Sequence, residues 1–254
     1  MGLYRTDAIV LGHRHLGEAD KILTLFSPQE GKVHAVARGV RRPRSSLLGG
    51  TQLFCYSNFL LMKGRNLDSV RQCDIKESFH KIRGNLEPMA YGLYFAELLR
   101  VSTPMEDKNQ QLFRFIIKTM YFLQEWQDLE LLKSIYEIKL MALQGYTPEL
   151  FYCISCGTKS FERVYFSPAL GGVLCQKCRN SDQRSIKINH NTLSTLKSLL
   201  YGTYEDLLGL KVRDEIKKQI NNIMTPFISY HIEKKLKTLQ FIKDVRQVQI
   251  YDTK

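Results

Sequence analysis

Alternating hydrophobic and polar positions occupy the first part of the chain and predict short strands. Glycines separate these runs, and period-two alternation with glycine punctuation is typical of β-structure. The expected strands lie at residues 8–11, 22–26, 33–37, 52–62 and 67–75. Five short strands in a segment of about 80 residues predict a small closed barrel of the OB type, and a small sandwich fits the pattern nearly as well.

The hydrophobic period lengthens after residue 80, where apolar side chains recur at helical spacing. The expected helices lie at residues 86–101, 112–126, 129–144, 191–201 and about 211–237. Pro148 ends the third of these helices, and Pro226 is expected to kink or divide the last one. Several packed helices form a bundle with its own core. We therefore expect the α+β class, with an N-terminal five-stranded OB-type barrel followed by an α-helical bundle domain.

Four cysteines form two C-x2-C pairs, Cys153 with Cys156 and Cys175 with Cys178, and 18 residues separate the pairs. This spacing is typical of a zinc ribbon or a related site. Four thiolates complete a tetrahedron and leave no open coordination position, so we predict one structural Zn²⁺ ion. Disulfides, an iron–sulfur cluster and thiols without metal are the alternatives.

The cysteine pairs interrupt the helical part of the chain and define three segments. Residues 1–80 are expected to form an OB-fold DNA-binding domain, and residues 81–150 with 184–254 the α-helical domain. Residues 151–183 are expected to form a zinc-binding insertion in that domain. No internal repeat or low-complexity linker marks a further boundary.

The densest positive charge of the chain lies in residues 38–46, which we call the arginine loop. It carries four arginines together with Gly39 and Pro43, a composition that predicts a mobile or extended loop able to lie along phosphates. A merely solvated loop is the alternative. Other basic residues of the barrel extend the same surface if the barrel folds as expected. The expected DNA contacts are Lys32, Arg38, Arg41, Arg42, Arg44, Lys63 and Arg65.

Net charge narrows the class of partner. The formal net charge is +12, and residues 1–80 contribute 12 Lys and Arg against 7 Asp and Glu. Basic surfaces attract nucleic acid or anionic membrane, and net charge alone does not separate these two. No apolar run approaches the ~20 residues of a membrane helix, and the N-terminus has no apolar segment of a signal peptide. We therefore expect a soluble cytoplasmic protein without a membrane partner.

Catalytic motifs are missing from the sequence. It contains no phosphate loop, no G-x-S-x-G and no H-E-x-x-H. Alternation places His13 and His15 on one face of a strand, where surface positions explain them. The rings of Phe54, Tyr56 and Phe59 are expected mainly in the barrel core, with base stacking as the alternative. We therefore expect a protein that is not an enzyme.

Several segments, in this order and spacing, resemble the RecO family of bacterial recombination mediators. The matching stretches lie at residues 17–21, 37–45, 96–99, 136–150, 153–157, 166–178 and 230–232. The resemblance implies an N-terminal OB-fold, a helical C-terminal domain and an inserted zinc module. Some members of the family lack the cysteines, whereas this chain keeps all four, which indicates that the metal holds local structure.

The same resemblance implies a function in DNA repair. It implies binding of single- and double-stranded DNA, annealing of complementary strands, and association with the bacterial nucleoid. The implied partners are RecR and the acidic C-terminal tail of single-stranded DNA-binding protein, and the complex helps load RecA. The tail requires an apolar pocket with a basic rim, for which Lys211, Arg213, Lys217 and Lys218 are candidates. A zinc-dependent nucleic-acid enzyme and an RNA-binding OB module are the competing hypotheses.

Overall fold

The computed structural model describes residues 2–252, and side chains for residues 2–248. Two compact units divide the chain. The first comprises the residues up to Trp126 together with those from Leu236 onward, and the second spans Gln127–Lys235. No helix within the described residues combines the length and the apolar character that a membrane crossing requires.

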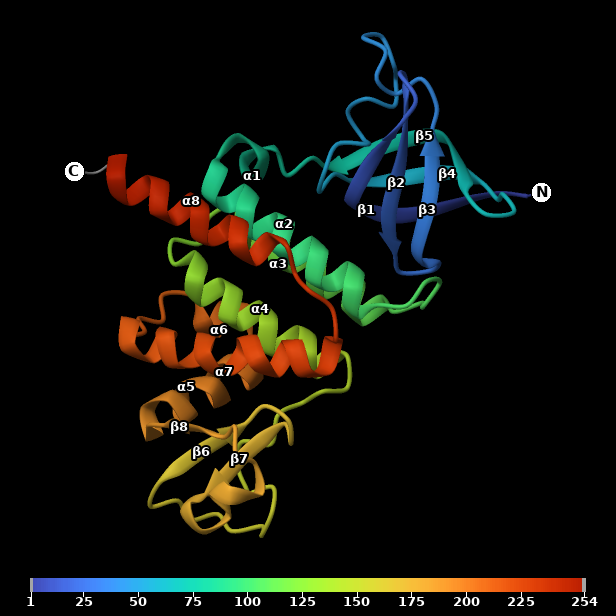
Figure 1. Ribbon diagram of the computed structural model, residues 1–254. Coiled ribbons are helices and arrows are strands. Elements are labelled where there is room, and N and C mark those ends of the chain that lie inside the picture. The colour runs from blue at the N-terminus through green and yellow to red at the C-terminus, as the bar shows by residue number, and fades with distance from the viewer. Residues whose placement is uncertain (1, 253–254) are drawn as a thin grey trace. The chain divides into compact units, whose positions relative to one another are not determined.

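A closed five-stranded barrel forms the N-terminal part of the first unit (Figure 1). Its strands follow the order β1-β2-β3-β5-β4, and β4 pairs with β1 to close the barrel. The β3–β5 pair is parallel and the other four pairs are antiparallel. This is the predicted OB-type barrel. The strands are β1 (Leu3–Leu16), β2 (Asp20–Ser27), β3 (Gly31–Ala37), β4 (Tyr56–Met62) and β5 (Asp68–Glu77).

Side chains along the strands alternate in direction, and those that point inward from each strand form the core of the barrel. In β2, Leu23 and Leu25 join the barrel core, whereas Phe26 points outward and packs on Phe113 with the ring centroids 6.2 Å apart. Because Phe113 belongs to helix α3 (Gln110–Leu123), β2 is buried on both faces, and every residue of β2 after Asp20 is buried, including the polar Thr24.

The aromatic residues before and within β4 are mainly core residues. Phe59 belongs to the barrel core, as expected. Phe54 is also fully buried but does not belong to that core, and Tyr56 packs edge-on against Phe113. The expected strand over residues 52–62 begins later, at Tyr56, because Phe54 adopts a left-handed conformation with φ 66°. This turn drives the Phe54 ring against Gly92 of α2, where a Cβ atom would lie only 2.9 Å from the ring.

Four helices complete the first unit, three of them directly after the barrel. The last one was not expected from the sequence. Its Thr238 donates from both the backbone N–H and the hydroxyl to the Glu97 carboxylate of α2, at 2.9 and 2.6 Å, which fixes the start of this helix beside α2 (Figure 1). These helices are α1 (His80–Gly84), α2 (Leu86–Ser102), α3 (Gln110–Leu123) and α8 (Thr238–Asp252).

The second unit combines helices with a small antiparallel sheet of order β7-β6-β8. Helix α7 runs through Pro226 without a break, so this proline does not divide the helix, and the alternative of a kink stays a prediction. Inside the unit, Lys133 and Glu137 form a buried ion pair of 3.0 Å on α4. The helices are α4 (Leu129–Leu143), α5 (His190–Tyr201), α6 (Tyr204–Leu207) and α7 (Asp214–Ile232), and the strands are β6 (Val164–Ser167), β7 (Gly172–Cys175) and β8 (Ile186–Ile188).

The first unit contains α1, α2, α3 and α8 together with the barrel. The sequence-based expectation had placed all helices in one domain. Contacts in the folded chain do not establish which segments fold independently. The boundaries near residues 80, 150 and 183 therefore stay a prediction.

Candidate metal centre and nucleic-acid interface

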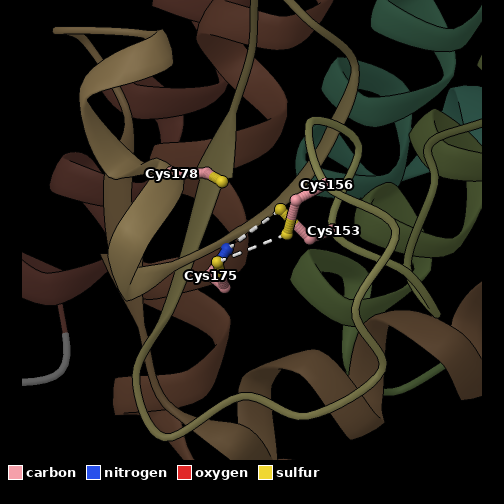
Figure 2. Close-up of side chains that lie close together, drawn as sticks. All are labelled: Cys153, Cys156, Cys175 and Cys178. Carbon is pink, nitrogen blue, oxygen red and sulfur yellow. Dashed lines mark hydrogen bonds between the residues drawn. The ribbon is translucent and has the colours of Figure 1, made fainter.

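The four cysteines of the two C-x2-C pairs converge on one point of the second unit (Figure 2). Their sulfur atoms all lie within 4.8 Å of one another, and Cys156 Sγ is 3.8 Å from Cys175 Sγ. Four thiolates around one ion with metal–sulfur distances of ~2.3 Å are separated by about 3.8 Å. A disulfide bond is only about 2.05 Å long. The spacing therefore fits four thiolates around a single cation.

Two tight turns present the thiols. In the first, the Gly157 N–H donates to the Cys153 carbonyl at 2.7 Å, and Gly157 has φ +75°, a left-handed conformation that favours glycine. In the second, β7 ends at Cys175 and a 3-10 helix, Gln176–Ser181, carries Cys178. The Cys175 N–H also donates to Cys153 Sγ at 3.4 Å, so the two turns are joined at the cluster.

The surroundings of the thiols favour a cation. Burial acts to raise the pKa of the Cys153 thiol, but hydrogen bonds from the backbone N–H groups of Cys175, Cys156 and Ser155 lower it to about 6. A hydrogen bond with Ser155 lowers the pKa of Cys178, but the neighbouring thiols raise it to about 12. Thiolates at this spacing repel one another, and a bound dication removes that repulsion.

The arginine loop projects four exposed guanidinium groups, those of Arg38, Arg41, Arg42 and Arg44. None of the four has a carboxylate ion pair among the residues that the structure describes. The loop is a succession of turns and not an extended segment, with the Arg42 N–H donating to the Gly39 carbonyl at 3.1 Å. Its positive charge is therefore displayed to solvent on a backbone that is folded into turns.

Three anchors hold the arginine loop to the barrel. The Val40 side chain is fully buried in the barrel core. The Gly39 N–H donates to the Asp20 carboxylate at 2.7 Å, and the Arg41 N–H donates to the Ala19 carbonyl at 2.9 Å. The end of the β1–β2 turn and the start of β2 therefore fasten the loop, which gives Asp20, the first residue of β2, a structural role. Sequence reasoning identified the arginines but not the anchoring roles of Asp20 and Val40.

Lys32, Lys63 and Arg65 differ in their exposure. Lys32 is only 9% exposed, and its ammonium group donates to the Arg100 carbonyl at 2.6 Å and to the Thr103 carbonyl. This burial removes Lys32 from the basic surface expected from the sequence. Lys63 is exposed but pairs with Glu106 at 3.2 Å, and Arg65 is exposed. The structure therefore gathers the four loop arginines and does not place Lys32 among them.

His13 and His15 lie on one face of β1, as the alternation predicts. Their rings stack with centroids 6.0 Å apart and an interplanar angle of 6°. Burial lowers the pKa of His13, and the positive charges of Lys21 and His15 lower it further. The His13 side chain therefore faces a basic environment that Lys21, missed as a candidate from the sequence, helps to create.

These features define a class: a basic OB-type barrel protein with an appended helical region and a four-thiolate centre that is able to hold a metal ion. Family models then match nearly the whole chain. The model described as Recombination protein O N terminal covers residues 1–79, and the one described as Recombination protein O C terminal covers residues 83–240.

Relatives named DNA repair protein RecO match over nearly their full length. The protein of Pelotomaculum thermopropionicum is 38% identical over 242 residues, which cover 95% of this chain and 94% of the relative. The protein of Acetivibrio thermocellus is 32% identical over 249 residues, covering 98% and 99%. The protein of Desulforamulus reducens is 36% identical over 243 residues, covering 95% and 94%. The chain belongs to the RecO family of DNA repair proteins.

Proposed function

We propose that this protein is a recombination mediator that binds single- and double-stranded DNA, mainly through the arginine loop. The observation that carries the proposal is the display of Arg38, Arg41, Arg42 and Arg44 on an anchored loop without carboxylate partners among the described residues. Guanidinium groups form charge-assisted hydrogen bonds with phosphate oxygens. Such contacts bind DNA irrespective of its sequence and weaken as salt rises. Arg65 is an additional contact at the exposed β4–β5 connection.

Annealing of complementary strands follows from the same charge. Two DNA strands repel each other, and a basic surface that neutralises their phosphates lowers this repulsion while base pairing supplies the specificity. This action needs no chemical step and no catalytic group. We therefore propose a mediator without turnover of its own.

The cysteine cluster is proposed to bind one structural Zn²⁺ ion. Cys153, Cys156, Cys175 and Cys178 supply all four ligands of a tetrahedral site, and the metal would hold the two turns together. A cluster with several iron atoms would hold its thiolates farther apart than one ion does. A hydrolytic zinc enzyme needs an open position for water, which four cysteine ligands do not leave.

The proposed partners are RecR and the acidic C-terminal tail of single-stranded DNA-binding protein, and the proposed outcome is loading of RecA on DNA in the bacterial cytoplasm, at the nucleoid. Of the rim candidates for the tail, Lys217 already pairs with Asp128 and Asp214, each at 2.8 Å. Lys211 and Lys218 are exposed and suit an acidic tail better.

Strand annealing is the direct test. Two complementary fluorescent oligonucleotides are mixed with the purified protein without nucleotide, at low and at moderate salt. We expect faster annealing without ATP, weakened by salt and by replacement of Arg38, Arg41 and Arg42. No acceleration by a folded, zinc-loaded protein would contradict a mediator that anneals DNA. Tighter binding of matched RNA than of DNA would favour an RNA-binding module, because 2′-hydroxyl groups distinguish the two.

A further inference from the structure

A small cavity lies on the barrel between strands β1, β2 and β3 and the end of helix α2. Its volume is about 180 Å³. Two guanidinium groups, two imidazoles, one hydroxyl and one apolar side chain form its wall. The lining residues are His13, Arg14, Ile22, Thr24, His34 and Arg100.

The wall of this cavity is basic. No carboxylate lines it, and neither Arg14 nor Arg100 has a carboxylate ion pair among the described residues. The nearest acidic side chain on α2 is Glu97, one turn before Arg100, and its carboxylate accepts two hydrogen bonds from Thr238. Glu97 and Arg100 attract each other electrostatically without forming an ion pair. Among the described residues, the cavity thus holds two guanidinium charges without a direct carboxylate partner, and an anion would neutralise them.

The His34 imidazole responds to these charges. Burial lowers the pKa of His34, and the positive charges of Lys32, Arg14 and Arg100 lower it further, against a backbone hydrogen bond with Leu23 that raises it. The His34 ring also lies 3.3 Å from the Thr24 hydroxyl. A bound anion would offset the positive charges and favour the imidazolium forms, which add donors to those of the arginines.

Size and donor number select the ligand. A cavity of about 180 Å³ leaves room for a phosphate group together with ordered water. It is smaller than the ~300 Å³ at which pockets for larger organic ligands begin. A phosphodiester inside a strand offers two free oxygens and one charge, whereas a phosphate monoester offers three oxygens and a charge of about −1.5 to −2. Two forked guanidinium groups with further donors match the monoester better.

We propose that this cavity binds a phosphate monoester, the terminal phosphate at the 5′ end of a DNA strand. The inference rests on the proposed DNA-binding function. Lys21 lies between the cavity and the arginine loop, because it precedes the lining residue Ile22 and pairs in register with Ala37, the residue directly before the loop. A strand whose end occupies the cavity can thus place its next phosphates on the loop.

The test compares one short single-stranded oligonucleotide with a 5′-phosphate and with a 5′-hydroxyl group, by fluorescence anisotropy on the full chain. The cavity variant is Arg14→Gln with Arg100→Gln. The control, Arg71→Gln with Arg114→Gln, removes the same charge from exposed positions of β5 and α3. We expect the unaltered protein and the control to bind the 5′-phosphate form about tenfold more tightly, as charged hydrogen bonds predict. The cavity variant should bind both forms equally.

Equal affinity of the unaltered protein for the two forms would overturn the proposal. Loss of the difference in the control as well would overturn it, since general charge would then explain the preference. A titration with inorganic phosphate adds a separate arm. Phosphate binding that the cavity variant loses, together with equal affinity for both oligonucleotide forms, would show a site for small free anions and not for strand ends. Failure of the proposed DNA binding itself would appear differently, as no binding of either oligonucleotide.

Discussion

The cysteine cluster and the arginine loop are the two regions of the chain that the sequence assigned to ligand binding. They differ in whether the fold itself brings all the binding groups to one point. The four thiols lie within 4.8 Å of one another, so the fold itself brings together a full ligand set for one ion. The four loop arginines share an anchored backbone but face solvent, and their partner has to come from outside. A converging ligand set therefore specifies its ligand closely, whereas a charged loop specifies only a class of polyanion.

The largest effect should come from breaking the ligand set. In Cys175→Ser we expect loss of bound zinc and a marked fall in the melting temperature of the second unit, because apparent zinc-binding free energies reach ~10–16 kcal/mol in small metal-dependent folds. Zinc content and thermal unfolding measure both changes. Full zinc content and unchanged melting of the variant would contradict a structural metal.

Cys73→Ser is the matched control for that variant. Cys73 packs against the barrel core, and burial raises the pKa of its thiol to about 11, so it is protonated at neutral pH. We expect full zinc content in this variant. Any fall in stability should then be confined to the barrel.

A smaller effect should come from releasing the arginine loop. Asp20→Ala removes the acceptor for the Gly39 N–H and should cost about 1–3 kcal/mol of unfolding free energy, as an unsatisfied donor does. It also removes a negative charge, which alone would strengthen DNA binding. We expect weaker binding in a filter or anisotropy assay, because the loop loses its fixed shape.

Asp74→Ala removes the same charge from an exposed position of β5 and serves as the comparison. Its DNA affinity should stay equal or rise. If Asp20→Ala bound DNA as tightly as Asp74→Ala, charge alone would matter and the anchoring of the loop would be irrelevant to binding.

The smallest effect concerns the aromatic side chains that pack around His231 in the second unit. His231 lies against Tyr146 and Phe227, both with centroid distances of 4.7 Å, and burial lowers its pKa. A lowered pKa means that the unfolded chain binds the proton more readily. Stability from this group is thus present above pH ~6.5 and falls as the pH drops below that value.

His231→Gln should remove this part of the pH dependence, a few tenths of a kcal/mol after solvent screening. Denaturant unfolding at pH 7.5 and 5.5 measures it, with His190→Gln on the exposed start of α5 as the control. An equal pH dependence in the unaltered protein and in His231→Gln would contradict this role for His231.

Local patterns predicted much of this molecule. Alternation located the five strands, and helical spacing located α2 to α5 and most of α7. The C-x2-C pairs located the thiol cluster. These predictions succeeded because each pattern depends only on residues that are close together in the sequence. Other features depend on residues far apart in sequence. Burial of Lys32 requires the carbonyls of Arg100 and Thr103, and the start of α8 requires Glu97. The cavity unites Arg14 with Arg100 across 86 positions, so no local pattern could predict it.

The central claim is that the arginine loop is the principal DNA contact, and the salt dependence of binding tests it most directly. Affinity for a single-stranded oligonucleotide is measured over a series of salt concentrations for the unaltered protein and for the variant in which Arg38, Arg41 and Arg42 are all glutamine. We predict weaker binding and a slope of log affinity against log salt that is flatter by roughly 0.7 for each lost phosphate contact. An unchanged slope would contradict the claim and move the principal contact to another surface.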